Sequence, residues 1–305
     1  MPKTKLILIV GPTATGKSDL AVELSTLFNG EIVSADSMQI YRYMDIGTAK
    51  PTREQRANAA HHLIDIVNPD EDYTAARYKK DASAKIEEIS SRGKNIFVAG
   101  GTGLYVKALT QGLFEGPASD ASIRQNLMEE AKTKGKEYIY EKLKEVDPIS
   151  ASTIHPNNLI RVIRALEVYN ISGKTMSDFQ REHGFSEEPF ETLKIGLIKE
   201  RDSLYRDIER RVDRMMEEGL LEETRRLLGM GYSSCLKPMC ALGYKEMCNF
   251  IAGEYNLEKA VEELKKNTRH YAKRQITWFK KDNEIRWFHP DGKKDIINLV
   301  KEFLS

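Results

Sequence analysis

Long hydrophobic runs are missing from this 305-residue sequence. No apolar stretch approaches the roughly 20 residues that a membrane-spanning helix needs, so the sequence excludes an integral membrane protein and predicts no membrane partner. The N-terminal segment MPKTKLILIV begins with basic residues, but its short apolar run leads directly into a glycine-rich turn. That arrangement is typical of a buried strand and not of a signal peptide, and we therefore expect a cytoplasmic protein.

Cysteine is scarce, and neither sign of charge is in excess. The three cysteines, Cys235, Cys240 and Cys248, are odd in number and lack a paired Cys/His spacing, which argues against a disulfide framework or a zinc site and predicts reduced thiols. The 47 basic and 46 acidic residues give a net charge of +1, so only local clusters of charge can indicate a partner. The length exceeds one typical domain of roughly 100–200 residues, which favours a principal domain with an appended or inserted one.

A phosphate-binding pattern is present near the N-terminus. The apolar residues 6–10 are followed by GPTATGKS and then by an amphipathic helical pattern. Gly11 and Gly16 allow backbone N–H groups to face a phosphate, the helix N-terminus adds positive potential, Lys17 supplies a charge and Ser18 offers a hydroxyl to a divalent ion. Strand, loop and helix follow in the order that this motif requires. Taken alone, the loop is compatible with an ATPase, a GTPase or a kinase.

The rest of the chain predicts an α/β fold: a P-loop NTPase-like parallel sheet flanked by helices, with an inserted helical subdomain. Strands alternate with helices, which indicates a parallel sheet that binds ligands at the carboxyl ends of its strands. Residues 116–189 are rich in Lys and Glu and read as helical, so we predict a core of residues 1–115 and 190–305 around this insertion. Further strands are expected at 31–36, 95–99 and 193–200, and long helices at 205–218 and 257–281.

Asp36 is the main candidate for a chemical role outside the loop. It ends an apolar strand, where a carboxylate could position magnesium or, as in small-molecule kinases, hold a substrate hydroxyl. A helix cap or a solvated turn is an equally good interpretation from spacing alone. No Asn-Lys-x-Asp guanine-recognition motif occurs in the sequence.

Seven segments together resemble a known family. They are GPTATGKS, SADSMQIYRYMDIGTAKP, HHLIDI, GGTGLY, RVIRALEVY, ALGYKE and TRHYAKRQITWF. Their order and spacing, from Leu6 to about Phe279, resemble the bacterial tRNA dimethylallyltransferases, also called tRNA isopentenyltransferases. The resemblance implies transfer of the dimethylallyl group from dimethylallyl diphosphate to the exocyclic N6 amine of the adenosine that follows the anticodon in tRNA.

The resemblance also implies roles for individual residues. The leaving diphosphate would be bound by the phosphate loop at Gly11, Thr13, Ala14, Thr15, Gly16, Lys17 and Ser18, with Mg2+ at Ser18. Lys17 and Arg211 would stabilise the developing charge, and Asp36 would act as the general base. Contacts to tRNA are implied for Asp36, Ser37, Met38, Gln39, Thr102, Arg161, Arg164, Lys273, Arg274 and Gln275.

Residues 265–281 carry seven Lys and Arg and no acidic residue, which is a footprint typical of a surface that binds a phosphate backbone. The helical spacing of Tyr271, Trp278 and Phe279 predicts that these aromatic rings face the core while the cations face outward. The insertion would clasp the anticodon stem-loop.

Two rival functions stay open: an adenylate isopentenyltransferase acting on free AMP, ADP or ATP, and a small-molecule kinase. The insertion and the basic helix argue against the first, because a free nucleotide needs neither. The Cys/His set of a zinc finger, which eukaryotic members carry, does not occur, so we expect a bacterial-type form, and a monomer in the absence of a coiled-coil repeat.

Overall fold

The structure is a computed structural model that describes residues 3–114, 116–185 and 187–305. These residues form two compact units. The first contains the chain up to Thr110 together with Glu188–Ser305, and the second consists of Gln111–Glu187. The second unit is thus an insertion in the sequence of the first.

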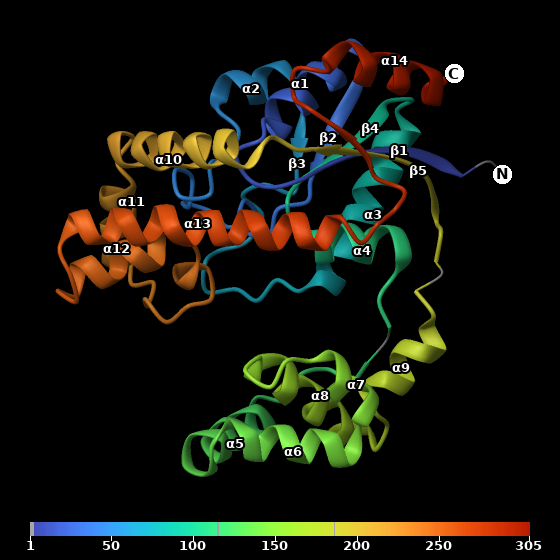
Figure 1. The fold of residues 1–305 in the computed structure, drawn as a ribbon. Coiled ribbons are helices and arrows are strands. Elements are labelled where there is room, and N and C mark those ends of the chain that lie inside the picture. The colour runs from blue at the N-terminus through green and yellow to red at the C-terminus, as the bar shows by residue number, and fades with distance from the viewer. Residues whose placement is uncertain (1–2, 115, 186) are drawn as a thin grey trace. The chain divides into compact units, whose positions relative to one another are not determined.

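A parallel sheet forms the centre of the first unit (Figure 1). All neighbouring strands pair in parallel, in the order β3-β2-β4-β1-β5-β6. The predicted P-loop NTPase-like sheet is therefore confirmed, although the second strand ends at Ser34 and not at Asp36. The strands are β1 (Thr4–Val10), β2 (Gly30–Ser34), β3 (His61–His62), β4 (Asn95–Ala99), β5 (Phe190–Leu197) and β6 (Arg286–Phe288).

Helices cover both faces of this sheet, which is why the central strands β1 and β4 carry continuous apolar runs instead of alternating polar and apolar residues. Along β1, Leu6 and Leu8 belong to the hydrophobic core on one face, while Ile7 and Ile9 belong to the core on the other. The Leu6 side packs with α3 (Ala75–Ser91) and α4 (Gly103–Gln111). The Ile7 side packs with α1 (Lys17–Leu27) and α14 (Lys293–Leu304). The short helix α2 (Arg53–Asn58) follows β2 in the chain.

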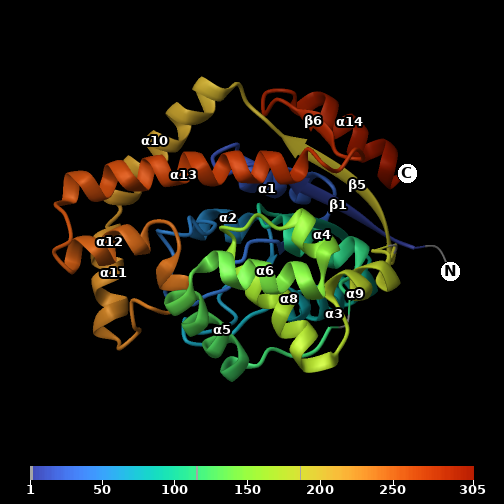
Figure 2. The same cartoon turned by 60° about the horizontal axis from the view of Figure 1, so that its bottom comes forward.

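A further group of helices extends the first core beyond the sheet, as Figures 1 and 2 both show. It consists of α10 (Arg201–Glu217), α11 (Leu220–Gly229), the 3-10 helix η1 (Pro238–Cys240), α12 (Tyr244–Ile251) and α13 (Leu257–Phe279). The predicted long helices at 205–218 and 257–281 correspond to α10 and α13. In the part of the chain that is described, no helix is both long and apolar enough to cross a membrane.

The second unit is helical and has a core of its own. Ile139, Leu143, Val162 and Leu166 are buried at its centre. Because these apolar side chains pack on one another, the insertion is a folded unit and not a long loop. Its helices are α5 (Ala121–Lys134), α6 (Lys136–Val146), α7 (Pro148–Thr153), α8 (Leu159–Ser172) and α9 (Met176–His183).

Candidate active site

The phosphate-loop motif connects β1 to the N-terminus of α1, the position that an anion-binding loop requires. Gly11 adopts φ 137°, and a Cβ atom there would lie 2.4 Å from the carbonyl oxygen of Leu197, so only glycine fits. Gly16 and Ala14 also have positive φ angles, of 84° and 64°, which curl the loop. The Lys17 Nζ atom donates a hydrogen bond of 2.6 Å to the Pro12 carbonyl, and the Thr15 hydroxyl donates to the same oxygen at 2.9 Å.

Gln275 of α13 joins this loop to the glycine-rich turn after β4. Its side-chain oxygen accepts from the Thr13 backbone N–H at 2.9 Å, and its amide nitrogen donates to the Gly101 carbonyl at 2.9 Å. A Cβ atom on Gly101 would lie 2.1 Å from that nitrogen. Gln275 is only 6% exposed, so its side chain lies beneath the loop, unlike those of its exposed neighbours Lys273 and Arg274.

Two cavities meet beside the loop. One, of about 1530 Å3, is lined by Ala14 and Gly16 together with cations of α10. The other, of about 520 Å3, is lined by Thr13 and by Asp36, Ser37, Met38 and Gln39, among others. Lys17, Ser18 and Arg211 line both. The loop, the predicted base and the predicted arginine are therefore gathered around one junction between two spaces.

The charges at this junction influence one another. Burial and the nearby Arg211 guanidinium lower the pKa of Lys17 to about 7, against the opposing influence of the Asp36 carboxylate. Burial likewise lowers the pKa of Arg211, and Asp36 again opposes the shift. Two cations and a single carboxylate thus share a part-buried space, and an anionic ligand there would relieve the repulsion between the cations.

Asp36 follows β2 and caps the turn after it. Its Oδ1 atom accepts from the backbone N–H groups of Met38 at 2.8 Å and Gln39 at 3.3 Å. No described residue donates to Oδ2, and Asp36 lines the smaller cavity. The capping role that the sequence suggested is present, but it uses one oxygen and leaves the other available.

Thr102, at the start of α4, supports this turn. Its hydroxyl oxygen accepts from the Ser37 backbone N–H at 2.9 Å and donates to the Ser37 hydroxyl at 3.2 Å. The Thr102 N–H donates to the Ala35 carbonyl at 3.1 Å, so this threonine binds both sides of Asp36.

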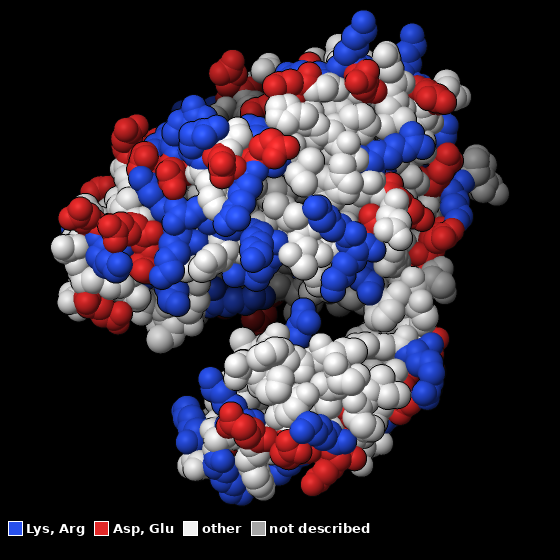
Figure 3. All heavy atoms as spheres, viewed as in Figure 1, with Lys and Arg blue, Asp and Glu red and all other residues white. Residues whose placement is uncertain are grey.

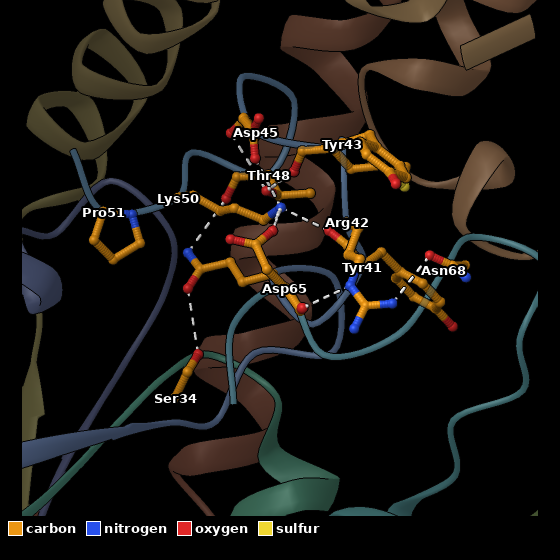
Figure 4. A network of polar contacts seen from close by, with 12 residues as sticks. Ser34, Tyr41, Arg42, Tyr43, Asp45, Thr48, Lys50, Pro51, Asp65 and Asn68 are labelled. Atoms are coloured by element: carbon orange, nitrogen blue, oxygen red, sulfur yellow. Dashed lines mark hydrogen bonds and ion pairs between the residues drawn. The ribbon is translucent and has the colours of Figure 1, made fainter. Parts of the chain in front are cut away.

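The segment after Gln39 is fixed by buried polar groups that our sequence reasoning did not identify. Lys50 is buried, and its Nζ atom donates to the Tyr41 carbonyl at 2.6 Å, to Asp45 at 2.8 Å and to Asp65 at 2.5 Å (Figure 4). Although burial acts in the opposite direction, the hydrogen bonds and positive charges of Lys50 and Arg56 lower the pKa of Asp65. Glu223 and Tyr244 hold the same segment from the helices. Lys50 lies in the segment SADSMQIYRYMDIGTAKP, and Tyr244 lies in ALGYKE. Both segments belong to the family resemblance, and that membership is the signal that could have identified the two residues.

Fewer cations of α13 are free to bind a phosphate backbone than the sequence predicts, because three of the seven in residues 265–281 form ion pairs within the protein. Lys265 pairs with Asp213 of α10 at 2.5 Å, and Arg269 pairs with Glu209 of α10 at 2.8 Å. Lys266 contacts Glu263 on its own helix at 3.2 Å. Within the described chain, the cations without an ion pair in residues 265–281 are Lys273, Arg274, Lys280 and Lys281. Figure 3 shows Lys and Arg gathered across the face of the first unit on which α13 lies.

The prediction for the aromatic residues of α13 is confirmed for Phe279 and wrong for Trp278. The buried stripe of α13 runs through Leu264, Thr268, Ala272, Gln275 and Phe279. Trp278 lies beside that stripe and is 37% exposed. Tyr271 is half-buried and lines the smaller cavity, where burial and the Asp36 charge raise its pKa.

The two predicted RNA contacts of the insertion differ in their surroundings. Arg161 is exposed at the start of α8 and has no ion pair with any described residue. Arg164 instead donates to the buried Glu167 carboxylate at 2.6 Å and to the Pro117 carbonyl at 2.9 Å. Arg164 therefore contributes to the internal structure of its unit, while Arg161 presents its guanidinium to solvent.

The phosphate loop lies at the carboxyl end of a central strand of the parallel sheet, and it shares a cavity with the Asp36 carboxylate. This arrangement places the chain in the class of P-loop-fold enzymes that use a phosphorylated substrate. Comparison with known proteins narrows the class. The sequence profile of the IPP transferase family matches residues 39–282. The chain belongs to this family, and the curated bacterial relatives that it resembles are named tRNA dimethylallyltransferase.

The similarity extends over whole chains. The chain is 53% identical over 304 residues to a tRNA dimethylallyltransferase 2 of Geotalea uraniireducens, covering 99% of this chain and 98% of that one. It is 51% identical to the tRNA dimethylallyltransferase of Geobacter sulfurreducens, with 98% and 96% covered.

Solved structures agree in fold. The tRNA isopentenylpyrophosphate transferase of Bacillus halodurans is 42% identical with a TM-score of 0.74, and the match covers 99% of this chain and 97% of that one. A eukaryotic dimethylallyltransferase acting on tRNA is 30% identical with a TM-score of 0.82, and 99% and 80% are covered.

Proposed function

We propose that this protein transfers the dimethylallyl group from dimethylallyl diphosphate to the N6 amine of the adenosine 3′-adjacent to the anticodon in tRNA, releasing diphosphate. The observation that carries the proposal is the junction at which Lys17, Ser18 and Arg211 line two cavities, with Asp36 in the smaller one. A donor held at the loop and an acceptor base beside Asp36 would meet there. The diphosphate would enter through the larger cavity and the acceptor base through the smaller one.

The loop would bind a leaving group. As the allylic carbon–oxygen bond breaks, its electron pair moves to the bridging oxygen of the diphosphate. The loop amides, Lys17 and Arg211 would stabilise that growing charge more strongly in the transition state than in the ground state. Burial and, after it, repulsion from Arg211 lower the pKa of Lys17, and a diphosphate bound beside the two cations would offset that repulsion.

Asp36 would be the general base. The N6 lone pair forms the new carbon–nitrogen bond, and the amine then carries a proton that must leave. The Oδ2 atom of Asp36 can accept that proton, because Oδ1 alone holds the turn through Met38 and Gln39. Ser37, Met38 and Gln39 would line the adenine pocket, and Thr102 would position the turn through Ser37.

Mg2+ fits the site as a partner of the diphosphate. Ser18 lies in the first turn of α1 and lines both cavities, and its hydroxyl has no hydrogen-bond partner among the described residues. The described residues contain no cluster of three or more His, Cys, Asp or Glu side chains that could hold a metal. A bound Mg2+ would therefore rely on Ser18 and on diphosphate oxygens, and would neutralise part of the diphosphate charge.

The tRNA would be bound by α13 and by the inserted unit. Lys273 and Arg274 are exposed and unpaired within the described chain, as a phosphate-binding surface requires. Arg161 would add a contact from the insertion, which we propose clasps the anticodon stem-loop. An unstacked loop adenosine can enter a protein pocket at a cost of a few kcal/mol.

The test is a transfer assay with radiolabelled dimethylallyl diphosphate and three acceptors: an unmodified anticodon stem-loop, AMP, and the same stem-loop with its target adenosine replaced by guanosine. We expect label on the first alone. Label on AMP at a comparable rate would favour the adenylate isopentenyltransferase. In a parallel assay with ATP, transfer of the γ-phosphoryl group to a small hydroxyl compound, with release of ADP, would favour a kinase.

A further inference from the structure

Glu223 is a buried carboxylate that the proposed chemistry does not use. It lies on α11 with only 3% of its surface exposed. Its Oε2 atom accepts from the backbone N–H groups of Asp45 and Ile46, both at 3.0 Å, and its Oε1 atom accepts from Ile46 at 3.1 Å and Gly47 at 3.2 Å. Three consecutive backbone donors that converge on one carboxylate form an anion-binding nest, here filled by a side chain of the protein itself.

Tyr244 of α12 completes this arrangement. Its hydroxyl donates to Oε1 of Glu223 at 2.6 Å. The tyrosine ring also packs on Gly47, where a Cβ atom would lie 2.5 Å from the ring, so glycine is required there. Glu223 and Tyr244, from two helices, therefore clamp the chain at residues 45–47. We call these two side chains the Glu223 clamp.

The clamped chain leads directly to a wall of the smaller cavity. Thr48 and Ala49 follow the clamp, and their carbonyl groups accept from the Gln39 amide nitrogen at 3.4 Å and 3.2 Å. The Ser34 hydroxyl donates to the other end of the Gln39 amide at 3.3 Å. Gly47, Thr48, Ala49 and Gln39 all line the cavity that contains Asp36.

Other groups around the segment do not replace the clamp. Lys50 pairs with Asp45, at the start of the clamped residues, and with Asp65, but it binds none of the three N–H groups that Glu223 accepts, and Arg226 lies 3.8 Å from Glu223 with an exposed side chain. Ala49 has φ 45°, a left-handed conformation that costs free energy for alanine unless its surroundings impose it. The orientation of the Gln39 amide thus depends on a strained loop fixed at both ends.

We propose that Glu223, with Tyr244, is a positioning residue for the acceptor base: it sets the orientation of Gln39 and the 47–49 wall against which the base is placed. This assignment rests on the proposed function for the identity of the base. The clamp itself, as a device that orders residues 45–49, does not. Loss of the clamp should therefore affect the acceptor more than the donor. Asp45, Ile46 and Ala49 also line the larger cavity, but among the described residues no hydrogen bond joins Glu223 or Tyr244 to the phosphate loop.

The first test is hydrogen exchange on the full-length protein. Glu223→Gln keeps the size of the side chain but places an NH2 group among N–H donors, and Tyr244→Phe removes only the hydroxyl. We expect faster exchange in a peptide covering residues 45–50 for both variants, with no change in a peptide covering β4. The matched control is Glu222→Gln, since this neighbouring glutamate is exposed. Unchanged exchange in both variants would overturn the clamp.

The second test is steady-state transfer to the anticodon stem-loop, with donor affinity measured separately by calorimetry. Misplacement of a reacting group by about 1 Å can cost about 100-fold, and we expect kcat/KM for the RNA to fall by up to that factor in Glu223→Gln. The Kd for dimethylallyl diphosphate should stay within about twofold, as for independent sites.

The outcomes separate the two proposals. Exchange that changes while kcat/KM for the RNA stays at the wild-type value would reduce Glu223 to a structural role and overturn the inference. An equal loss of donor and acceptor affinity would do the same, because the effect would then not be confined to the acceptor wall. A wild-type protein that transfers nothing to RNA would overturn the proposed function, and with it the identity of the base, while the exchange experiment would still decide whether the clamp exists.

Discussion

Replacement of Asp36 by Asn distinguishes two roles of this residue, that of a general base and that of a cap for the turn after β2. In the structure, the capping bonds to Met38 and Gln39 use Oδ1, and an asparagine oxygen can accept both. The change from a charged to a neutral acceptor weakens such bonds by about 1 kcal/mol in total. For a protein of this size we expect the melting temperature to fall by roughly 2–4 °C at most.

The catalytic effect should be much larger. Loss of a general base typically reduces the rate about 100- to 10,000-fold, equivalent to about 2.7–5.4 kcal/mol of activation free energy. That range exceeds the expected loss of stability, so the two roles give distinguishable results. The Asp36 charge also opposes the lowering of the Lys17 pKa, and its removal should therefore weaken donor binding at neutral pH.

The assay is single-turnover transfer to an anticodon stem-loop at saturating dimethylallyl diphosphate, which removes the effect on donor binding. Asp19→Asn is the matched control: it makes the same change of charge beside the phosphate loop, on an exposed side chain that bonds to Gln55 at 2.6 Å. If Asp36→Asn transfers the group within about tenfold of the wild-type rate, below the range for a general base, Asp36 is a structural residue.

Three further predictions concern the charges. Because the pKa of Lys17 is about 7 in the free protein, it is mostly neutral at pH 8, and binding of dimethylallyl diphosphate there should take up close to one proton, with affinity falling as pH rises above 7. Calorimetry in buffers of different ionisation enthalpy measures that uptake, and Lys17→Met should abolish it; equal uptake in both proteins would contradict the assignment. Lys273→Ala combined with Arg274→Ala should reduce the slope of log K for tRNA against log salt by about 1.5, whereas the paired Lys265→Ala should change it less. In the inserted unit, Arg164→Ala should lower the free energy of unfolding by about 1–3 kcal/mol in urea, because it takes a partner from a buried carboxylate, while Arg161→Ala should leave stability unchanged and weaken RNA binding. Equal stability losses would show that the ion pair with Glu167 contributes nothing.

The sequence predicted best where one local pattern determines one local structure. The phosphate loop was predictable because the required strand, glycines, lysine and helix follow one another within about 20 residues, and the parallel sheet followed from alternating strands and helices. The cation pairs of α13 were not predictable, since Lys265 and Arg269 meet acidic residues of α10 more than 50 positions away in the chain. Local spacing carries no information about such partners.

The buried polar groups show the same limit. Glu223 sits in a helix with an exposed glutamate directly before it, and nothing in the local pattern separates the two. The resemblance implies a tRNA contact for Gln275, and that contact stays a prediction; the structure adds that its side chain lies on the buried stripe and holds the phosphate loop, which local spacing does not reveal. Helical spacing predicted the correct periodicity for the aromatic residues of α13, but the buried stripe includes Phe279 and not its neighbour Trp278.

The adjacency of Arg274 and Gln275 limits how α13 can change during evolution or design. An α-helix turns by 100° per residue, so a single inserted residue upstream would bring the arginine to the place of the glutamine. A guanidinium has no acceptor for the Thr13 N–H, and the phosphate loop would lose its support. Substitutions on the outer face of α13 are therefore open to variation in RNA preference, but insertions and deletions between its buried anchor Leu264 and Gln275 are not.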